Sequence, residues 1–221
     1  MRIFLLLFVC GGALPVQAAS FDDSLIVYAV NIHRTPMQSW GPGYGIYLGK
    51  GLFITAAHVA GHTWLTRPKV VIAGKEYATT VVKAGDFETV DVTLLSVQEA
   101  ILPGRLRLRR NSLCDGTPRP GQQVVTVIPE GTARSHILSP GVLPANARQF
   151  DTVIGDVATT GNSGSGVFDA ERRCLLGIIS RKISMDLKRR NGKPGKPEMT
   201  DIAKYFVPAS VIREFIPVDL R

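Results

Sequence analysis

Three polar residues of this sequence could together cleave an amide or ester bond. His58 follows the small residues Thr55–Ala57, Asp91 lies in an apolar stretch, and Ser163 is at the centre of the glycine-rich segment 159–166. A serine hydroxyl is a weak nucleophile at neutral pH and needs a base within hydrogen-bond reach. Histidine can serve as this base because its pKa is close to neutral, and a carboxylate fixes the tautomer of its ring. The three residue types therefore predict acyl-transfer catalysis.

Each of these residues also has a simpler interpretation. A single histidine is more often structural than catalytic, Asp91 could face solvent on an alternating strand, and the segment around Ser163 could be a plain polar loop. A carboxylate within Val90–Leu95, however, is costly to bury unless it is paired. The backbone amides of Gly161 and Ser163 are the expected donors to an oxyanion, and each such donor contributes about 3–4 kcal/mol. The catalytic interpretation is favoured because one mechanism uses all of these groups.

The rest of the chain predicts an all-β protein that positions these side chains. Twenty-two glycines and fourteen prolines are spread along 221 residues, of which 45% are apolar, a composition typical of many short strands joined by turns. Strands are expected over Ser24–Ile32, Gly43–Leu48, Leu52–Thr55, Val70–Ala73, Glu76–Lys83, Val90–Val97, Gln122–Ile128, His136–Leu143, Thr152–Val157, Gly166–Phe168, Leu175–Ser180 and Ala203–Val207.

Two domains are expected, of residues 19–104 and 105–221. Leucine and arginine alternate in Leu102–Arg110, which predicts a linker strand on a surface at this boundary. The first domain carries the histidine and the aspartate, and the second carries the serine. Pro208 suits the first turn of a helix, and the apolar residues of 211–216 share one helical face, so a short helix is expected to end the second domain.

Residues 1–18 are interpreted as a cleavable signal peptide. Arg2 precedes the apolar run Ile3–Val9, and Val16–Ala18 offers small residues for cleavage. The alternatives are an uncleaved anchor and a lipid-modified Cys10, and the second is disfavoured because a bulky residue precedes the cysteine. The expected location is secreted or periplasmic, with no stable membrane insertion after signal removal, since the apolar run is too short to span a bilayer.

The sequence predicts neither a cofactor nor a metal site. Cys114 and Cys174 remain after signal removal, and such an even pair in an exported protein can form a disulfide; two buried free thiols are the alternative. Neither cysteine has metal-ligand spacing with a histidine, and no glycine-rich phosphate loop is present.

Basic residues dominate the charge of the chain, which is +8. Five of them fall in Lys188–Lys196, without an acidic residue. We interpret this stretch as a solvated loop, with contact to anionic surfaces or acidic substrates as the alternative. It lacks interleaved aromatic residues, so no nucleic-acid partner is expected.

Three motifs, in this order, resemble those of the chymotrypsin-like (trypsin-fold) serine proteases. They are TAAHV at 55–59, DVTLL at 91–95 and GNSGSGVF at 161–168. The phrase TTGNSGS at 159–165 resembles the bacterial branch, which includes glutamyl endopeptidases and HtrA-type proteases. The resemblance implies two six-stranded antiparallel β-barrels with the site between them. It also implies a serine endopeptidase that acts on proteins or peptides through an acyl-enzyme.

The resemblance further implies where a substrate binds. Ser180 matches the serine that hydrogen-bonds the triad aspartate, and the backbone of Ser180–Lys182 would pair with the substrate main chain. The departures from the family pattern bear on specificity. Arg181 and Lys182 replace the usual tryptophan and glycine, which could narrow the pocket or favour acidic groups. In an ungapped count Val157 matches the pocket floor, with Asp156, one position away, as the alternative. Ile179 replaces the histidine of glutamyl endopeptidases, so a small or apolar substrate side chain is expected.

Two other classes of protein compete with this interpretation. A catalytically inactive, trypsin-fold binding protein remains the alternative, because the geometry of the oxyanion loop decides activity. An α/β-hydrolase esterase is disfavoured because it requires Gly-x-Ser-x-Gly and the order Ser, Asp, His. Here Ser165 stands where that motif has its last glycine, and the order is reversed.

Overall fold

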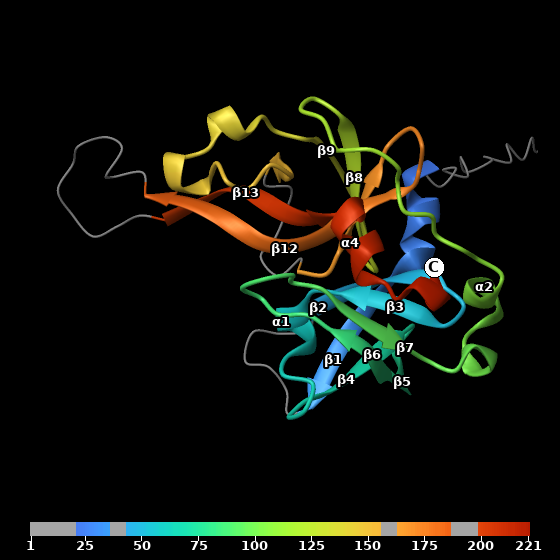
Figure 1. Ribbon diagram of the computed structural model, residues 1–221. Coiled ribbons are helices and arrows are strands. Elements are labelled where there is room, and N and C mark those ends of the chain that lie inside the picture. Colours follow the sequence, from blue (N-terminus) through green and yellow to red (C-terminus); the bar gives the residue numbers. More distant parts are fainter. Residues whose placement is uncertain (1–20, 36–42, 156–162, 187–198) are drawn as a thin grey trace, which may run out of the picture.

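The computed structural model describes residues 21–35, 43–155, 163–186 and 199–221, which form two antiparallel sheets (Figure 1). The all-β prediction is confirmed, and both sheets are curved into the barrels of a trypsin-like fold. No helix in these ranges is long and apolar enough to cross a membrane.

The first sheet has seven strands in the order β5-β4-β1-β2-β3-β7-β6. Its outermost strands, β5 and β6, are separated in sequence by Thr79 alone, and the Thr79 hydroxyl donates to the carbonyl of Pro68 at 2.6 Å. The expected single strand Glu76–Lys83 is therefore bent and broken at Thr79, which gives seven strands instead of six. The strands are β1 (Ala29–Thr35), β2 (Gly43–Gly49), β3 (Leu52–Thr55), β4 (Arg67–Ile72), β5 (Lys75–Ala78), β6 (Thr80–Ala84) and β7 (Thr93–Ser96).

The second sheet has six strands in the order β10-β13-β12-β11-β8-β9. An antiparallel bridge between Ile137 and Ile154 joins its two ends and closes the barrel. The strands are β8 (Gln123–Ile128), β9 (Gly131–His136), β10 (Val153–Gly155), β11 (Gly166–Asp169), β12 (Leu175–Asp186) and β13 (Met199–Pro208).

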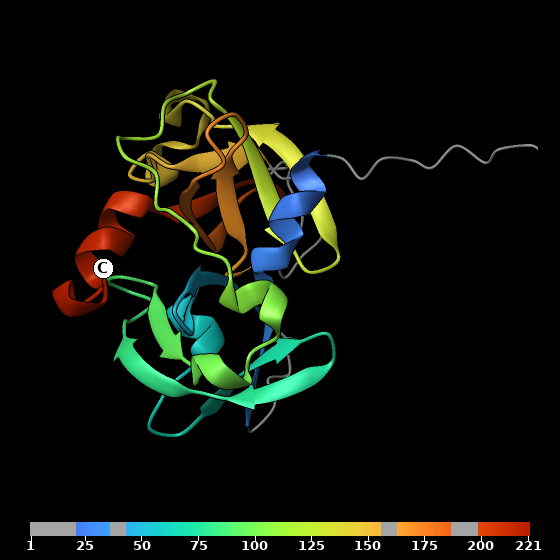
Figure 2. The ribbon, with the colours of Figure 1, turned by 90° about the vertical axis from the view of Figure 1, so that its right-hand side faces the viewer.

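Short helical segments connect the strands. Helix α4 begins after Pro208, as expected, and buries Ala209, Ile212 and Phe215. It packs on β12 and β13 at the junction of the two sheets, where the Lys83 ammonium donates to the carbonyl of Phe215 at 2.9 Å (Figure 2). The segments are η1 (Phe21–Tyr28), α1 (Ala57–Ala60), η2 (Glu99–Ile101), α2 (Gly104–Arg107), η3 (Pro140–Val142), η4 (Ala145–Ala147), α4 (Ala209–Phe215) and η5 (Val218–Leu220).

The strand predicted for the linker Leu102–Arg110 is wrong, because this segment contains α2 and no strand. Pro103 precedes the helix, where its missing N–H costs nothing. Leu102 and Leu106 are buried, whereas Leu108 is 89% exposed. The two buried leucines are thus four residues apart, as they are on one face of a helix.

Two other segments form less strand than predicted. The Ser24–Ile32 strand begins only at Ala29, because η1 crosses the second sheet and is held there by an ion pair of Asp22 with Arg134 at 2.6 Å. The segment His136–Leu143 is mostly not a strand, because β9 ends at His136 and Pro140, which has no N–H to donate, starts η3.

Residues of both sheets share one hydrophobic core. Ile46, Ile54 and Leu94 of the first sheet belong to the same buried cluster as Phe168 and Ile178 of the second. A disulfide joins Cys114 to Cys174, with 4.9 Å between the Cα atoms, so the two cysteines are not free thiols. The bond links the connection between the sheets to the start of β12.

Candidate active site

The structure brings His58 and Asp91 together at the junction of the two sheets. His58 lies in α1, which follows β3, and Asp91 lies two residues before β7 (Figure 1). The His58 ring nitrogen Nδ1 is 2.9 Å from Asp91 Oδ2, and the His58 backbone N–H donates to Asp91 Oδ1 at 3.0 Å. One carboxylate therefore fixes both the ring and the backbone of the histidine.

Asp91 is 2% exposed and is held by a second side chain. The Ser180 hydroxyl, from β12 of the other sheet, donates to Asp91 Oδ2 at 2.6 Å. Burial by itself raises the pKa of Asp91, but the hydrogen bonds from His58 and Ser180 outweigh burial and lower this pKa below its usual value. Asp91 is therefore an ionised partner for the histidine at neutral pH.

Ser163 joins this network beside Ser180. The Ser163 hydroxyl donates to the Ser180 carbonyl at 3.3 Å, and the Ser163 carbonyl accepts from the Tyr44 N–H at 2.9 Å. The next residue, Gly164, has φ +85°, and a Cβ atom there would lie 1.9 Å from the Tyr44 carbonyl oxygen. Only glycine therefore fits at this position, which fixes how Ser163 is presented.

Phe87 and Arg181 complete the wall next to His58. The Phe87 ring meets the His58 ring edge-on, with 5.3 Å between the ring centres. The Arg181 guanidinium lies 4.0 Å from the centre of the Phe87 ring and donates to the Phe87 carbonyl at 2.6 Å. The side chain of β12 that was expected to modify the pocket thus contacts the loop next to the histidine.

The other residues expected at the site are placed differently. Ile179 is buried in the core of the second barrel, and only its backbone contacts the Ser163 segment, through Gly164 N and Ser165 O. The ammonium of Lys182 pairs with Asp201 at 2.6 Å. Gly161, Val157 and the basic stretch 188–196 lie outside the described residues.

Sequence reasoning missed three residues of this region. Phe87 and Arg34 lie next to the histidine, and Arg34 donates to the His58 carbonyl at 3.2 Å. Neither stands out in the sequence. Lys204 is buried in β13, and a lysine inside the apolar stretch Ala203–Val207 is a signal of the same kind as Asp91.

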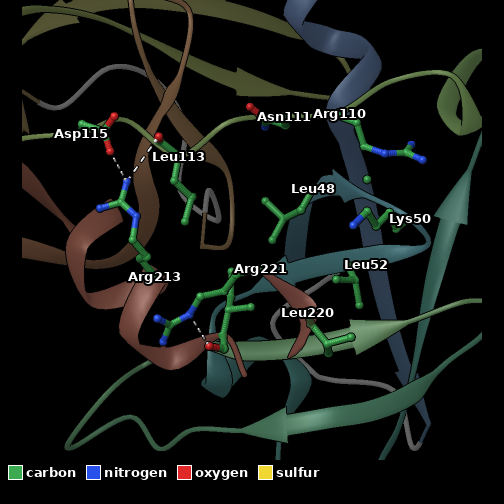
Figure 3. A pocket seen from close by; sticks show the side chains of 12 residues that line it. Leu48, Lys50, Leu52, Arg110, Asn111, Leu113, Asp115, Arg213, Leu220 and Arg221 are labelled. Carbon is green, nitrogen blue, oxygen red and sulfur yellow. Dashed lines mark hydrogen bonds and ion pairs between the residues drawn. The ribbon is translucent and has the colours of Figure 1, made fainter. Parts of the chain in front are cut away.

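Two hollows of the surface differ in their relation to these residues. One of about 300 Å³ is lined by His58, Phe87 and Arg34, among others. The larger, of about 450 Å³, contains none of the three predicted catalytic residues (Figure 3). Leucines and cations alternate around it, and two of the cations are engaged within the fold: Arg213 pairs with Asp115, and Arg221 donates to the carbonyl of Ile216. Of the two hollows, the smaller is therefore the one that contains a predicted catalytic residue, His58.

No group of three or more histidine, cysteine, aspartate or glutamate side chains in the described ranges could hold a metal ion.

Comparisons with known proteins found one family model and several solved structures that resemble this chain. The family model described as the trypsin-like peptidase domain matches residues 43–178. Among solved structures, the Rv3671c protease from M. tuberculosis in its active form has a TM-score of 0.59 at 16% identity, covering 87% of this chain and 81% of that one. The MamO protease domain from Magnetospirillum magneticum has a TM-score of 0.56 at 21% identity, covering 87% of this chain and 97% of that one. No curated protein matches the sequence.

Proposed function

This chain belongs to the trypsin-like peptidase family, and we propose that it is an exported serine endopeptidase whose triad is His58, Asp91 and Ser163. The observation that carries the proposal is the hydrogen-bonded series from Ser180 through Asp91 to His58, with the Ser163 hydroxyl beside the Ser180 carbonyl. These contacts join residues that are distant in sequence, and the pair of His58 with Asp91 is the one that orients the base in acyl transfer.

The reaction follows from these roles. The Ser163 Oγ attacks the substrate carbonyl carbon while His58 Nε2 takes the hydroxyl proton. Asp91, hydrogen-bonded at Nδ1, keeps the ring in the correct tautomer and stabilises the imidazolium that forms. The C–N bond then breaks, the amine leaves with the proton from His58, and the acyl group remains on Ser163 as an ester. Water, deprotonated by the same histidine, hydrolyses the ester.

The edge of β12 offers a place for the substrate main chain. Strand β11 pairs with β12 only as far as Ile178, whereas β13 continues along the other side of β12 to Asp186. Within the described ranges, no strand pairs with the β11-side edge of Ser180–Lys182. An extended peptide can add to such an edge through main-chain hydrogen bonds, which would bring its carbonyl group to Ser163.

Export is supported by two features of the chain. Residues 1–18 have the layout of a cleavable signal peptide, and they lie outside the described residues. The disulfide between Cys114 and Cys174 suits an oxidising compartment such as the periplasm or the extracellular space.

Labelling with a fluorophosphonate probe tests the proposal. The probe reacts with a serine only when that serine is activated by its base. We expect labelling of the mature protein at Ser163, and loss of labelling in both Ser163→Ala and His58→Ala. All three proteins should give the same circular dichroism spectrum. A folded wild-type protein that is not labelled would contradict the proposal and favour a non-catalytic binding protein with this fold.

A further inference from the structure

Lys204 of β13 is buried at a position where the fold does not require a charged side chain. It is 1% exposed, and among the residues that the structure describes it is the only buried lysine or arginine. Lysine is rarely fully buried, because removing its ammonium group from water is unfavourable. The neighbouring residues of this strand, Ala203 and Tyr205–Val207, show that an apolar side chain would suit the strand pattern.

The strand register places Lys204 close to the reacting serine. Lys204 is directly opposite Lys182 of β12 and Ile154 of β10. Opposed residues of antiparallel strands lie about 4.5–5.5 Å apart at their Cα atoms. Lys182 is two residues beyond Ser180, whose carbonyl accepts the Ser163 hydroxyl. Lys204 is therefore one strand away from the edge on which we place the substrate.

The alternation of side chains directs Lys204 into the second barrel. Residues two apart on a strand share a face, so Lys204 lies on the same face as Phe206. Phe206 is fully buried in the core cluster of this barrel, together with Ile154 and Ile179. Lys204 thus stands at the end of that core, beyond Phe206, on the side of the residues that follow Ser180.

Cations outnumber carboxylates on the strands around this point. On β12 and β13, Arg181, Lys182 and Lys204 carry three positive charges, against the two carboxylates of Asp186 and Asp201. The pKa of Asp201 is lowered, mainly by hydrogen bonds from Lys182 and Ser184, and also by the nearby charges of Lys182 and Lys204. Lys204 therefore adds its field to a region that already favours anions.

We propose that Lys204 makes this peptidase prefer an aspartate or glutamate immediately before the cleaved bond. The inference rests on the proposed function, since it concerns the substrate residue whose carbonyl group lies at Ser163. A carboxylate that enters the end of the second barrel meets a cation in a poorly hydrated place, where an ion pair is strongest. The proposed preference replaces the expectation of a small or apolar substrate side chain. That expectation depended on Val157, which lies outside the described residues.

Isosteric substrates test the charge separately from size. The substrates are succinyl-Ala-Ala-Pro-X p-nitroanilides, with X as Glu, Gln, Asp, Asn or Leu, and the measurement is kcat/KM of the mature enzyme. We expect Glu over Gln, or Asp over Asn, by about tenfold or more, the ratio typical of a hydrogen bond to a charged group. Lys204→Met removes the charge at similar length and should bring this ratio close to one. The matched control, Lys69→Met on β4 of the first sheet, should leave it unchanged.

The outcomes separate this inference from the proposed function. If Ser163 is labelled by the fluorophosphonate probe but acid and amide substrates are cleaved equally, the preference is wrong and the endopeptidase stands. If folded wild-type protein is not labelled, the proposed function fails and the preference falls with it. If circular dichroism shows that Lys204→Met does not fold, the wild-type ratios and Lys204→Arg, which keeps the charge and should keep the preference, decide the question. If Lys204→Met keeps the wild-type ratio of kcat/KM between acid and amide substrates, Lys204 is not the source of the preference.

Discussion

Asp91 connects the two sheets at the level of single residues. It is almost fully buried, and its carboxylate accepts hydrogen bonds from His58 of the first sheet and Ser180 of the second. Unpaired, a buried carboxylate would take up a proton and could no longer orient the histidine. In the proposed mechanism Ser180 is therefore a positioning residue, which acts on His58 through Asp91.

Replacing Ser180 by alanine should weaken catalysis without unfolding the protein. The variant removes one hydrogen bond to a charged group, worth about 1.5–3 kcal/mol, so kcat/KM should fall by about 10- to 100-fold. Asp91→Asn, which disturbs the tautomer itself, should cost about 10⁴-fold in kcat. Loss of a donor should also raise the pKa of Asp91, so the loss of kcat/KM relative to wild type should grow as the pH is lowered. Equal activity of Ser180→Ala and wild type over the whole profile would contradict the role of Ser180.

The candidate site residues that could be identified from the sequence are those whose chemistry is unusual for their surroundings. Asp91 in an apolar stretch was predictable because a buried charge needs a partner, and His58 and Ser163 followed from the mechanism. Phe87 was not predictable, because it acts through a contact with Arg181, and the two residues are far apart in sequence. Lys204 carried a signal like that of Asp91, but only the strand register shows that it lies near Ser163.

At the scale of elements, a carboxylate organises the turn between β11 and β12. Asp169 Oδ1 accepts from the backbone N–H groups of Glu171 and Arg172 at 2.8 and 2.7 Å, and Oδ2 accepts from Gln122 Nε2 at 2.7 Å. Burial raises the pKa of Asp169, but these hydrogen bonds outweigh burial and lower this pKa. The turn leads directly into Cys174 and β12, so it helps to set where β12 begins.

Asp169 should make the stability of the protein depend on pH. Because its pKa is lower in the folded state, its ionised form stabilises the fold above about pH 3.9, the unfolded value, and this contribution is lost as pH falls through the folded pKa. Asp169→Asn should cost about 1–3 kcal/mol of unfolding free energy at pH 7 and less at pH 3, as measured by urea unfolding. The exposed Asp219→Asn serves as control and should match wild type at both values. A difference for Asp169→Asn that grows toward acid would contradict this account.

Strands were predictable where apolar residues alternate or cluster between turns, and connections were not. The sequence could not distinguish a strand from a helical turn in Leu102–Arg110, because short apolar runs fit either period. The bend at Thr79 depends on closure of the barrel, a tertiary constraint that leaves no local pattern.

At the scale of the whole molecule, the two barrels are held together by a common core and by contacts across the site. The buried cluster that contains Ile46 of β2 also contains Phe168 of β11 and Ile212 of α4. The barrels therefore cannot move apart without exposing apolar surface. The contacts of Arg181 with Phe87 add a link on the side of His58.

Arg181 should couple the second barrel to the loop that contacts the histidine. Its guanidinium stacks on the Phe87 ring and donates to the Phe87 carbonyl, and a planar group is needed to do both. Arg181→Ala should lower kcat/KM by about tenfold, and Arg181→Lys should restore only part of this loss, because an ammonium does not stack. A double-mutant cycle of Arg181→Ala with Phe87→Leu, measured by thermal unfolding, should give a coupling energy of about 1 kcal/mol. The exposed Arg105→Ala in α2 should show no coupling to Phe87→Leu. Additive effects of Arg181→Ala and Phe87→Leu would mean that the two barrels do not communicate through this contact.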